Sequence, residues 1–263
     1  MGYKSYLEII GKFRYIDKGD VVYLVSDIFH LMKQAKEHGE IFNGDRFLDT
    51  IMEVIGEEGT LLVPTFNWDF CKGIAFDYKK TKCKVGALGN MALKNDNFIR
   101  TRHPIYSFAV RGKDAGMLSE IDPSNSFGEG TCFSYMEQKN AKALVIGLPA
   151  MSGLTFMHHA EQIYGVPFRF NKNFTAMYKY KDEPEEERTY SMYVREYSMN
   201  VEEHTEPFDE IIEKLGVCKT EIYNGVPFRV LYLKEIMELL RIDILYNQCG
   251  NIYKYYGQMD YIK

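Results

Sequence analysis

Four short apolar runs rich in β-branched residues occur in the first 150 residues, and segments with helical spacing separate them. The runs are Val21 to Val25, Thr60 to Val63, Ser107 to Val110 and Ala143 to Ile146. Runs of this length and composition are typical of buried strands. The clearest helix between them is predicted over Asp45 to Ile55. This alternation predicts an α/β fold in which helices cover both faces of a central sheet.

The last third of the chain changes to segments in which polar and apolar residues alternate. Thr175 to Tyr180 and Thr189 to Tyr197 follow the period of two that is typical of half-buried strands. The charged stretch Lys181 to Arg188 lies between them. We interpret it as the solvated acidic tip of a β-hairpin, whose charges favour solubility and have no role in recognition.

Two amphipathic helices are predicted after the hairpin, over Glu206 to Leu215 and Lys234 to Ile244, with a strand at Val226 to Leu233 between them. The chain has no internal repeat, no low-complexity linker and no Pro/Gly-rich joint. We therefore expect residues 1–263 to form a single domain. Its predicted architecture is a layered α/β/α fold with a mixed central sheet, plus the hairpin and helices of the C-terminal third.

Charge and cysteine content limit the partners. The 263 residues carry a formal net charge of −5 and no Lys/Arg run long enough to form a basic stripe, so nucleic acid is not expected. The five cysteines lack a CxxC or Cys/His ligand spacing, which favours reduced thiols and no metal site.

No targeting or membrane segment is recognisable in the sequence. Lys4 and Glu8 are charged where the apolar core of a signal peptide would lie, and no apolar stretch approaches about 18 residues. We expect a cytoplasmic protein without a membrane segment.

The common nucleotide-binding and hydrolase motifs are absent. The chain has no GxxxxGK[ST] or GxGxxG loop, and Gly86-Ala87-Leu88-Gly89 is too short to replace one. Gln162 to Pro167 half matches the pyrophosphate loop of the largest acetyltransferase superfamily, but Pro167 stands where a free N–H is needed. The GxSxG elbow of serine hydrolases is also missing. The chemistry must therefore lie in other side chains.

His158 and Glu161 form the best acid/base pair in the sequence. They lie three residues apart in Thr155 to Glu161, a run that can be helical, so both side chains can point to one side. An imidazole beside a carboxylate is the minimum equipment for general base catalysis near neutral pH. His159 would point about 100° away around the helix. On spacing alone, an exposed helical contact without a catalytic role remains the alternative.

His103 is a second candidate. Pro104 disfavours the helical conformation for the residue before it, which holds His103 in an extended loop where binding groups are often found. Ser107 and Phe108 follow where a strand begins. The alternative is a histidine that only hydrogen-bonds the backbone.

Several segments in this order resemble the aminoglycoside 3-N-acetyltransferase family, whose members move an acetyl group from acetyl-CoA to a sugar amine. The resemblance covers roughly residues 15 to 170. The matching segments are Gly19 to Asp27, Glu58 to Phe66, Arg100 to Phe108, Phe127 to Thr131 and Leu154 to Glu161. Several motifs in the family's order are more specific than any one of them.

The resemblance implies a role for individual residues. It makes His158 the catalytic base, with Glu161 beside it, and it places Ser107 and the His103-Pro104 loop at the thioester end of the CoA site. The Ser107 hydroxyl or a nearby backbone N–H is the expected donor to the oxyanion. Ser26 and Asp27 would meet the CoA phosphates, and Thr65 and Phe108 are assigned to the same CoA site.

Two departures from the family pattern concern CoA binding. The family usually has a His-Ser-Ser run where this chain has Val25-Ser26-Asp27, and Asp27 places a negative charge where a phosphate should approach helix-end N–H groups. Asp27 can instead cap the following helix. The segment Lys33 to Glu40 is rich in Lys and Glu where the family tends to be rich in glycine.

The sequence therefore predicts an acetyl-CoA-dependent N-acetyltransferase that acts by direct transfer on an amino sugar or an aminoglycoside, an activity of the antibiotic-resistance type. A nucleotide-linked or free amino sugar and a polycationic aminoglycoside both remain open as acceptor, as does a homo-oligomeric state. A non-catalytic CoA- or sugar-binding protein of the same fold is the alternative, and a hydrolase that uses His103 or His158 is more remote. Carboxylates expected to help bind a polycation are Asp69, Asp77, Glu129 and Glu161.

Overall fold

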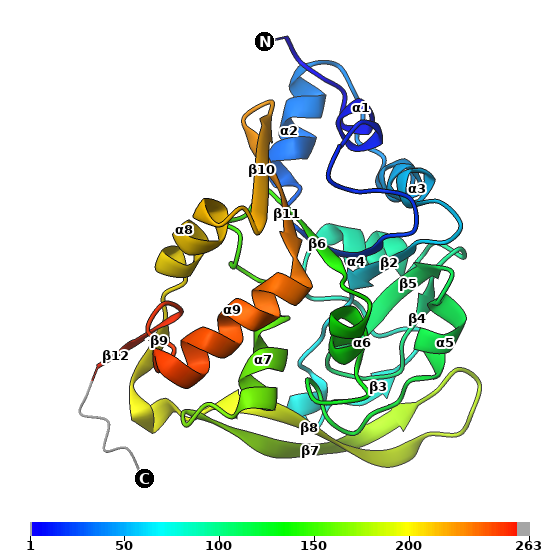
Figure 1. The fold of residues 1–263 in the computed structure, drawn as a ribbon. Helices are drawn as coiled ribbons and strands as arrows, with labels where there is room; N and C mark the ends of the chain where they lie inside the picture. Colours follow the sequence, from blue (N-terminus) through cyan, green and yellow to red (C-terminus); the bar gives the residue numbers. More distant parts are fainter. Residues whose placement is uncertain (1, 257–263) are drawn as a thin grey trace.

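A mixed sheet of seven strands forms the centre of the computed structural model, which describes residues 2–256 (Figure 1). The strands lie in the order β10-β11-β6-β1-β2-β5-β4. Their bounds are β1 Val21–Ser26, β2 Thr60–Pro64, β4 Ile99–Arg100, β5 Phe108–Gly112, β6 Lys142–Ile146, β10 Cys218–Tyr223 and β11 Val226–Tyr232.

The three central strands are parallel. β1 pairs in parallel with β2 and with β6, whereas the outer strands β5, β4, β11 and β10 join by antiparallel pairing. The carboxyl ends of β1 and β2 therefore meet at one edge of the sheet, where Asp27 and Thr65 follow them. Such an edge is the usual place for a ligand in an open α/β sheet.

Helices cover both faces of the sheet. Side chains alternate along β1, so Val22 and Leu24 pack in one hydrophobic cluster while Tyr23 and Val25 pack in the other. The first face is covered by α1 Tyr6–Gly11, α2 Phe29–Glu37, α3 Gly44–Ile55 and α4 Ala87–Ala92. The second is covered by α5 Ala115–Glu120, α6 Cys132–Gln138, α7 Met157–Tyr164, α8 Glu206–Lys214 and α9 Leu233–Tyr246. The predicted α/β/α layering is confirmed.

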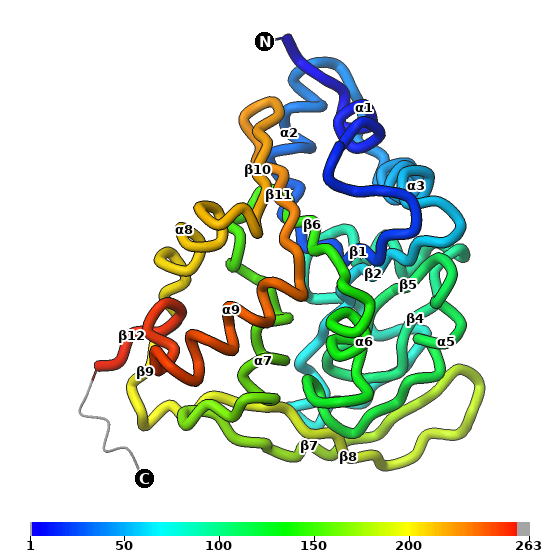
Figure 2. Tube along the Cα trace, viewed as in Figure 1, coloured from blue at the N-terminus to red at the C-terminus, as the bar shows by residue number. Residues whose placement is uncertain are grey.

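A long hairpin lies at the end of the molecule opposite α1 (Figure 2). Its strands are β7 Arg169–Lys179 and β8 Glu186–Arg195, and the short β3 Phe76–Asp77 joins β7 in parallel. A separate two-stranded sheet pairs β9 Val201–Glu203 with the C-terminal β12 Tyr253–Tyr255. The short 3-10 helices are η1 Phe70–Lys72 and η2 Tyr197–Met199.

Several boundaries differ from the sequence prediction. The hairpin was expected to begin at Thr175, but β7 starts at Arg169, in a stretch of mostly exposed residues that shows no burial pattern. Glu186 to Arg188 were expected in the tip, yet they pair with Ala176 to Tyr178 as the first residues of β8. Edge pairing needs only backbone groups, so an acidic side chain does not prevent it.

No helix within residues 2–256 is long and apolar enough to span a bilayer. From the sequence, the aromatic segment Ile252 to Tyr261 is predicted to pack on the same chain rather than on a partner. Ile252 and Tyr253 do so, since both are buried. Residues 257–261 of that expectation lie outside the described part of the chain.

Candidate active site

Helix α7 presents His158 and Glu161 on one side, as their spacing predicts. The imidazole Nδ1 of His158 lies 2.7 Å from Oε2 of Glu161. His159 points elsewhere, with its ring against the Phe127 carbonyl and the Glu137 carboxylate. The helix therefore separates the two adjacent histidines, and only His158 pairs with Glu161.

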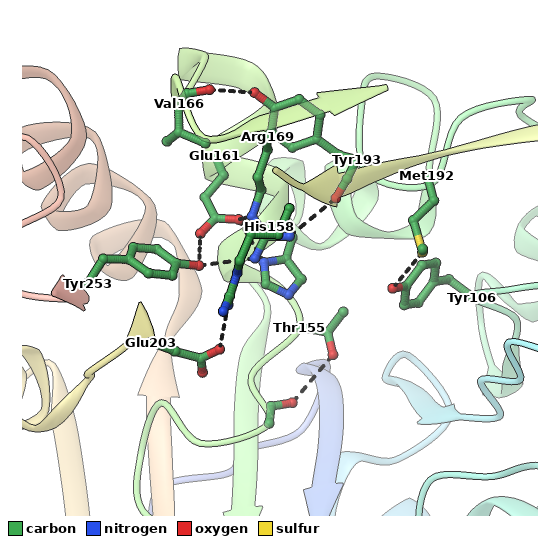
Figure 3. Close-up of polar contacts among 12 residues, drawn as sticks. Tyr106, Thr155, His158, Glu161, Val166, Arg169, Met192, Tyr193, Glu203 and Tyr253 are labelled. Atoms are coloured by element: carbon green, nitrogen blue, oxygen red, sulfur yellow. Dashed lines mark hydrogen bonds and ion pairs between the residues drawn. The ribbon is translucent and has the colours of Figure 1, made fainter. Parts of the chain in front are cut away.

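Glu161 is fully buried and is contacted from three sides (Figure 3). Arg169 places Nε 2.8 Å from Oε2, and the Tyr253 hydroxyl donates a hydrogen bond to Oε1. Burial alone would raise the pKa of Glu161, but His158, Arg169 and Tyr253 together outweigh it, so the pKa lies below its usual value. Glu161 is therefore a carboxylate at neutral pH.

The ionised Glu161 fixes the tautomer of His158. A carboxylate only accepts hydrogen bonds, so Nδ1 of the neutral imidazole must carry the proton and Nε2 must carry the lone pair. Within residues 2–256, Nε2 has no protein partner, and the side chain is 19% exposed in the wall of a cavity. An unprotonated nitrogen facing a cavity is the arrangement that a general base requires.

Two cavities meet near this pair. The first, of about 570 Å³, lies at the carboxyl ends of β1 and β2, and we call it the sheet-edge cavity. The second, of about 550 Å³, lies between His158 and the hairpin, and we call it the hairpin cavity. Trp68 lines both. Thr155 lines the sheet-edge cavity just before α7 begins, so the helix that carries His158 starts beside that cavity.

The lining of the two cavities differs in character. The sheet-edge cavity is lined by Tyr23, Leu24, Val25, Ser26, Asp27, Ile28, Phe29, Met32, Val63, Pro64, Phe66, Trp68, Val85, Gly86, Ala87, Leu88, Gly89, Leu148, Gly153 and Thr155. The hairpin cavity is lined by Trp68, Tyr106, His158, Arg169, Phe170, Lys172, Phe174, Met192, Tyr193, Val194, Arg195, Glu196, Tyr197 and Glu203. The first is mostly apolar, whereas the second carries several charges.

Ser26 and Asp27 lie in the wall of the sheet-edge cavity, where the sequence analysis placed the CoA site. One oxygen of the Asp27 carboxylate accepts a hydrogen bond from the Phe29 backbone N–H at 2.9 Å, at the start of α2. The opposite wall contains Gly89 of α4. A Cβ on Gly89 would lie 2.4 Å from the Pro64 carbonyl oxygen, so glycine allows α4 to approach the end of β2.

Ser107, Thr65, His103 and Phe108 do not line either cavity. The buried Ser107 hydroxyl lies 2.8 Å from Thr65 Oγ1 and accepts from Arg100 Nε at 3.1 Å. Phe108 is fully buried in the core. The polar side chains of Ser107, Thr65 and His103 have interior partners in this structure, and the roles expected for these residues and for Phe108 at the CoA site stay predictions.

His103 serves the loop that carries Tyr106. Its Nδ1 accepts backbone N–H groups from Ile105 at 3.2 Å and Tyr106 at 3.0 Å. Burial lowers the pKa of His103 to about 3, so the ring stays neutral. The Tyr106 hydroxyl in turn accepts from Trp68 Nε1 at 3.2 Å and faces Met192 Sδ at 3.3 Å. His103 thus holds the backbone of the loop that carries Tyr106.

The structure adds residues to which the sequence analysis gave no role. Arg169 follows Glu161 by eight residues, and nothing in that spacing links its side chain to the carboxylate. Tyr253 lies 92 positions from Glu161, so no local signal could have revealed the contact. Trp68 and Tyr106 lie beside or within the matching segments, and their place in the cavity wall depends on the packing of separate loops.

The carboxylates expected to bind a polycation are placed elsewhere. Asp69 lies 2.5 Å from Lys84 Nζ, and Asp77 accepts backbone N–H groups of its own turn. Glu129 is exposed, and Glu161 lies behind His158 and Arg169. None of the four lines the hairpin cavity. Within residues 2–256, no group of three or more His, Cys, Asp or Glu side chains is arranged to hold a metal ion.

Comparisons with known proteins agree with this architecture. A family model described as aminoglycoside 3-N-acetyltransferase matches residues 34–241. Comparison with curated protein sequences gives no significant match.

Solved structures of similar fold cover nearly the whole chain. Aminoglycoside acetyltransferase AAC(3)-Xa is 20% identical, with a TM-score of 0.75 over 91% of this chain and 92% of that one. AAC-IIIb in a binary complex with CoASH is 14% identical, with a TM-score of 0.75 over 92% and 97%. Sisomicin-bound AAC-VIa is 16% identical, with a TM-score of 0.73 over 94% and 99%.

Proposed function

The chain belongs to the aminoglycoside 3-N-acetyltransferase family and is an acyltransferase, and on that premise we propose that it acetylates an acceptor amine directly from acetyl-CoA with His158 as the general base. The observation that supports this role most is the pairing of His158 Nδ1 with the buried Glu161 at 2.7 Å. That contact leaves Nε2 of the neutral ring with a free lone pair, on a side chain that lines the hairpin cavity where an acceptor can lie.

The reaction needs one proton acceptor and no covalent intermediate on the protein. The lone pair of the neutral acceptor nitrogen attacks the thioester carbonyl carbon and forms the C–N bond, while His158 Nε2 takes a proton from that nitrogen. The C–S bond then breaks, and the sulfur leaves with its electron pair. The imidazolium returns the proton to sulfur, so the products are the N-acetyl acceptor and CoASH. The Glu161 carboxylate stabilises the imidazolium between the two steps.

We place the donor in the sheet-edge cavity and the acceptor in the hairpin cavity. The first cavity has the mostly apolar lining that a pantetheine arm prefers, and it lies where ligands bind in open α/β sheets. The similar AAC-IIIb structure contains CoASH, which supports acetyl-CoA as the donor. Trp68 and Thr155 then mark the junction where the thioester would meet the acceptor nitrogen.

The sisomicin-bound AAC-VIa structure supports an acceptor that is an amine on a sugar. His158 lines the hairpin cavity together with Trp68 and Tyr106, whose aromatic rings can pack against a sugar. An amine placed there lies between the base and the junction with the donor cavity.

A non-catalytic CoA-binding protein of the same fold remains the second candidate. The observation that favours it is Asp27, whose carboxylate lies in the wall of the sheet-edge cavity and would repel a phosphate. The His158–Glu161 pair favours the enzyme, because a binding protein has no need for a desolvated carboxylate behind a histidine.

The test follows CoA release from acetyl-CoA against a panel of amines, with the wild type beside His158→Ala. We expect turnover to fall by about 10²- to 10⁴-fold in the variant, which is the usual contribution of a general base. Calorimetric titration with CoA should give the same affinity for both proteins. Equal turnover would remove the role given to His158, and CoA binding without turnover on any amine would favour the binding protein.

A further inference from the structure

We propose that the acceptor is an amine that also carries an acidic group, a phosphate or a carboxylate, and that Lys172 binds this group in the hairpin cavity. The inference rests on the proposed function, because it takes the hairpin cavity beside His158 as the acceptor site. It names the substrate class of that site, which neither the family nor the similar structures supply for this chain.

The charges of the hairpin cavity do not suit a polycation. Its lining includes three cationic side chains, Arg169, Lys172 and Arg195, against two carboxylates, Glu196 and Glu203. An aminoglycoside carries several ammonium groups, each of which needs a carboxylate or a neutral acceptor when it is desolvated. Arg169 is compensated by Glu161 behind it and Arg195 by Glu203, so among the described residues Lys172 and Glu196 are the lining charges without an ion-pair partner. One such carboxylate cannot satisfy the several ammonium groups of an aminoglycoside, whereas Lys172 can attract a ligand with one acidic group.

Both carboxylates are also engaged within the protein. Glu203 lies 3.6 Å from Arg195 Nη2. Glu196 accepts hydrogen bonds from the backbone N–H of Ser198 at 3.2 Å and from its hydroxyl at 2.8 Å, and these contacts lower the pKa of Glu196. A polycation entering the cavity would have to compete with these existing contacts.

The three lining cations differ in whether a carboxylate of the protein already pairs with them. Arg169 lies 2.8 Å from the buried Glu161, and Arg195 is close to Glu203. Among residues 2–256, no carboxylate lies within ion-pair distance of Lys172. Its Nζ lies 5.5 Å from the centroid of the Phe174 ring. Lys172 is therefore the lining cation whose charge remains available to a ligand.

The strand geometry aims Lys172 at the same space as its apolar neighbours. Phe170, Lys172 and Phe174 alternate along β7, so they share one face, and all three line the cavity. Met192 lies directly opposite Lys172 on β8 and also lines it. The cavity thus offers an apolar surface to the body of the acceptor, together with one available cation.

Trp68 provides a direct readout of ligand binding, because it is the single tryptophan of the 263 residues and lines both cavities. Its fluorescence should report CoA and acceptor binding without any need for turnover. A ligand can therefore be tested for binding even if the acetyl transfer is slow.

The experiment uses the full chain and compares glucosamine, glucosamine 6-phosphate, muramic acid and kanamycin, by Trp68 fluorescence and by CoA release. Lys172→Ala is the test variant, and Lys179→Ala is the matched control on the same strand outside the cavity. We expect an anion-bearing amine to bind more tightly than glucosamine or kanamycin. The preference for it over glucosamine should fall about tenfold in Lys172→Ala, the usual value of a hydrogen bond to a charged group. Lys179→Ala should keep the preference.

The two anion-bearing amines identify the acidic group. A preference for glucosamine 6-phosphate indicates a phosphate, and a preference for muramic acid indicates a carboxylate. Tighter binding of kanamycin, no response to either anion-bearing amine, or a preference that survives Lys172→Ala would each overturn the inference. Rapid acetylation of kanamycin would overturn it while the proposed function stands. CoA binding without CoA release on any amine would instead contradict the proposed function, and the fluorescence preference would still decide the inference.

Discussion

The hydroxyl of Tyr253, on the C-terminal strand β12, donates a hydrogen bond to the buried carboxylate of Glu161 on α7. Tyr253 lies beyond residues 34–241, which the family model matches. Strand β12 therefore contributes a contact to the carboxylate of the proposed catalytic pair from a segment outside the matched region.

Replacement of Tyr253 by phenylalanine should weaken that support. The ring would still pack against Phe168, but one oxygen of a fully buried carboxylate would lose its donor. We expect the free energy of unfolding to fall by about 1–3 kcal/mol, the usual effect of leaving a buried polar group without its partner. We also expect kcat to fall about tenfold while the Kd for CoA is unchanged. The matched control is Tyr246→Phe, whose ring is largely exposed on α9. Equal losses in both variants would contradict a specific role for Tyr253.

Glu161→Gln tests the carboxylate itself. The amide oxygen can still accept from His158 Nδ1, so the ring keeps its orientation, but no negative charge stabilises the imidazolium. We expect kcat to fall by at least about tenfold, within the range of a general base whose function is impaired. The buried Arg169 also loses its counter-charge, which should cost about 3–5 kcal/mol of stability.

A second variant separates activity from folding in that test. Glu161→Gln combined with Arg169→Met removes both charges, and it should recover much of the stability because no uncompensated charge remains. Its activity should stay low. Recovery of kcat together with stability would mean that Glu161 has only a structural role.

The strands at the centre of the sheet were predictable because each is buried on both faces. β1, β2 and β6 appear in the sequence as continuous apolar runs, and the structure contains them within one residue of the expected ranges. β10 was missed because it is an edge strand with polar residues. The turn that follows it, Asn224-Gly225, has positive φ at both residues, which is the signal of a two-residue hairpin and could have revealed it.

The candidate site was predictable only where it is local. His158 and Glu161 share one helix, so their spacing fixed their contact. Ser107 occupies the expected place at the start of β5, but its side-chain direction depends on pairing with β2, which turns it toward Thr65 and the interior. The charges of the hairpin cavity come from β7, β8 and β9, and only the three-dimensional pairing shows which of them remain available.

Asp27→Asn tests whether the negative charge of Asp27, which departs from the family pattern, weakens CoA binding. The asparagine oxygen can still accept from the Phe29 N–H, so the start of α2 is preserved, while one negative charge leaves the wall of the sheet-edge cavity. Two like charges about 4 Å apart in water repel by about 1 kcal/mol. We therefore expect CoA to bind roughly fivefold more tightly. The measurement is calorimetric titration at two salt concentrations, and the gain should shrink at the higher one. An unchanged or weaker affinity would show that no CoA phosphate lies near Asp27.

The buried Glu161 also predicts how stability depends on pH. Its pKa in the folded protein lies below the ordinary value of 4.5, so the carboxylate stabilises the fold at pH values above 4.5, and this contribution is lost as the pH falls through the lowered pKa. At pH 7 the wild type should be more stable than Glu161→Gln, and the difference in the free energy of unfolding should narrow steadily below about pH 4.5. Urea denaturation of both proteins across this range measures the difference directly. Asp182→Asn is the control, because Asp182 pairs with Lys79 at an exposed position and its removal should have little effect at any pH. A gap between wild type and Glu161→Gln that stays constant from pH 7 down to pH 3 would mean that folding does not lower the pKa of Glu161, and the stabilising contacts assigned to its carboxylate would lose their basis.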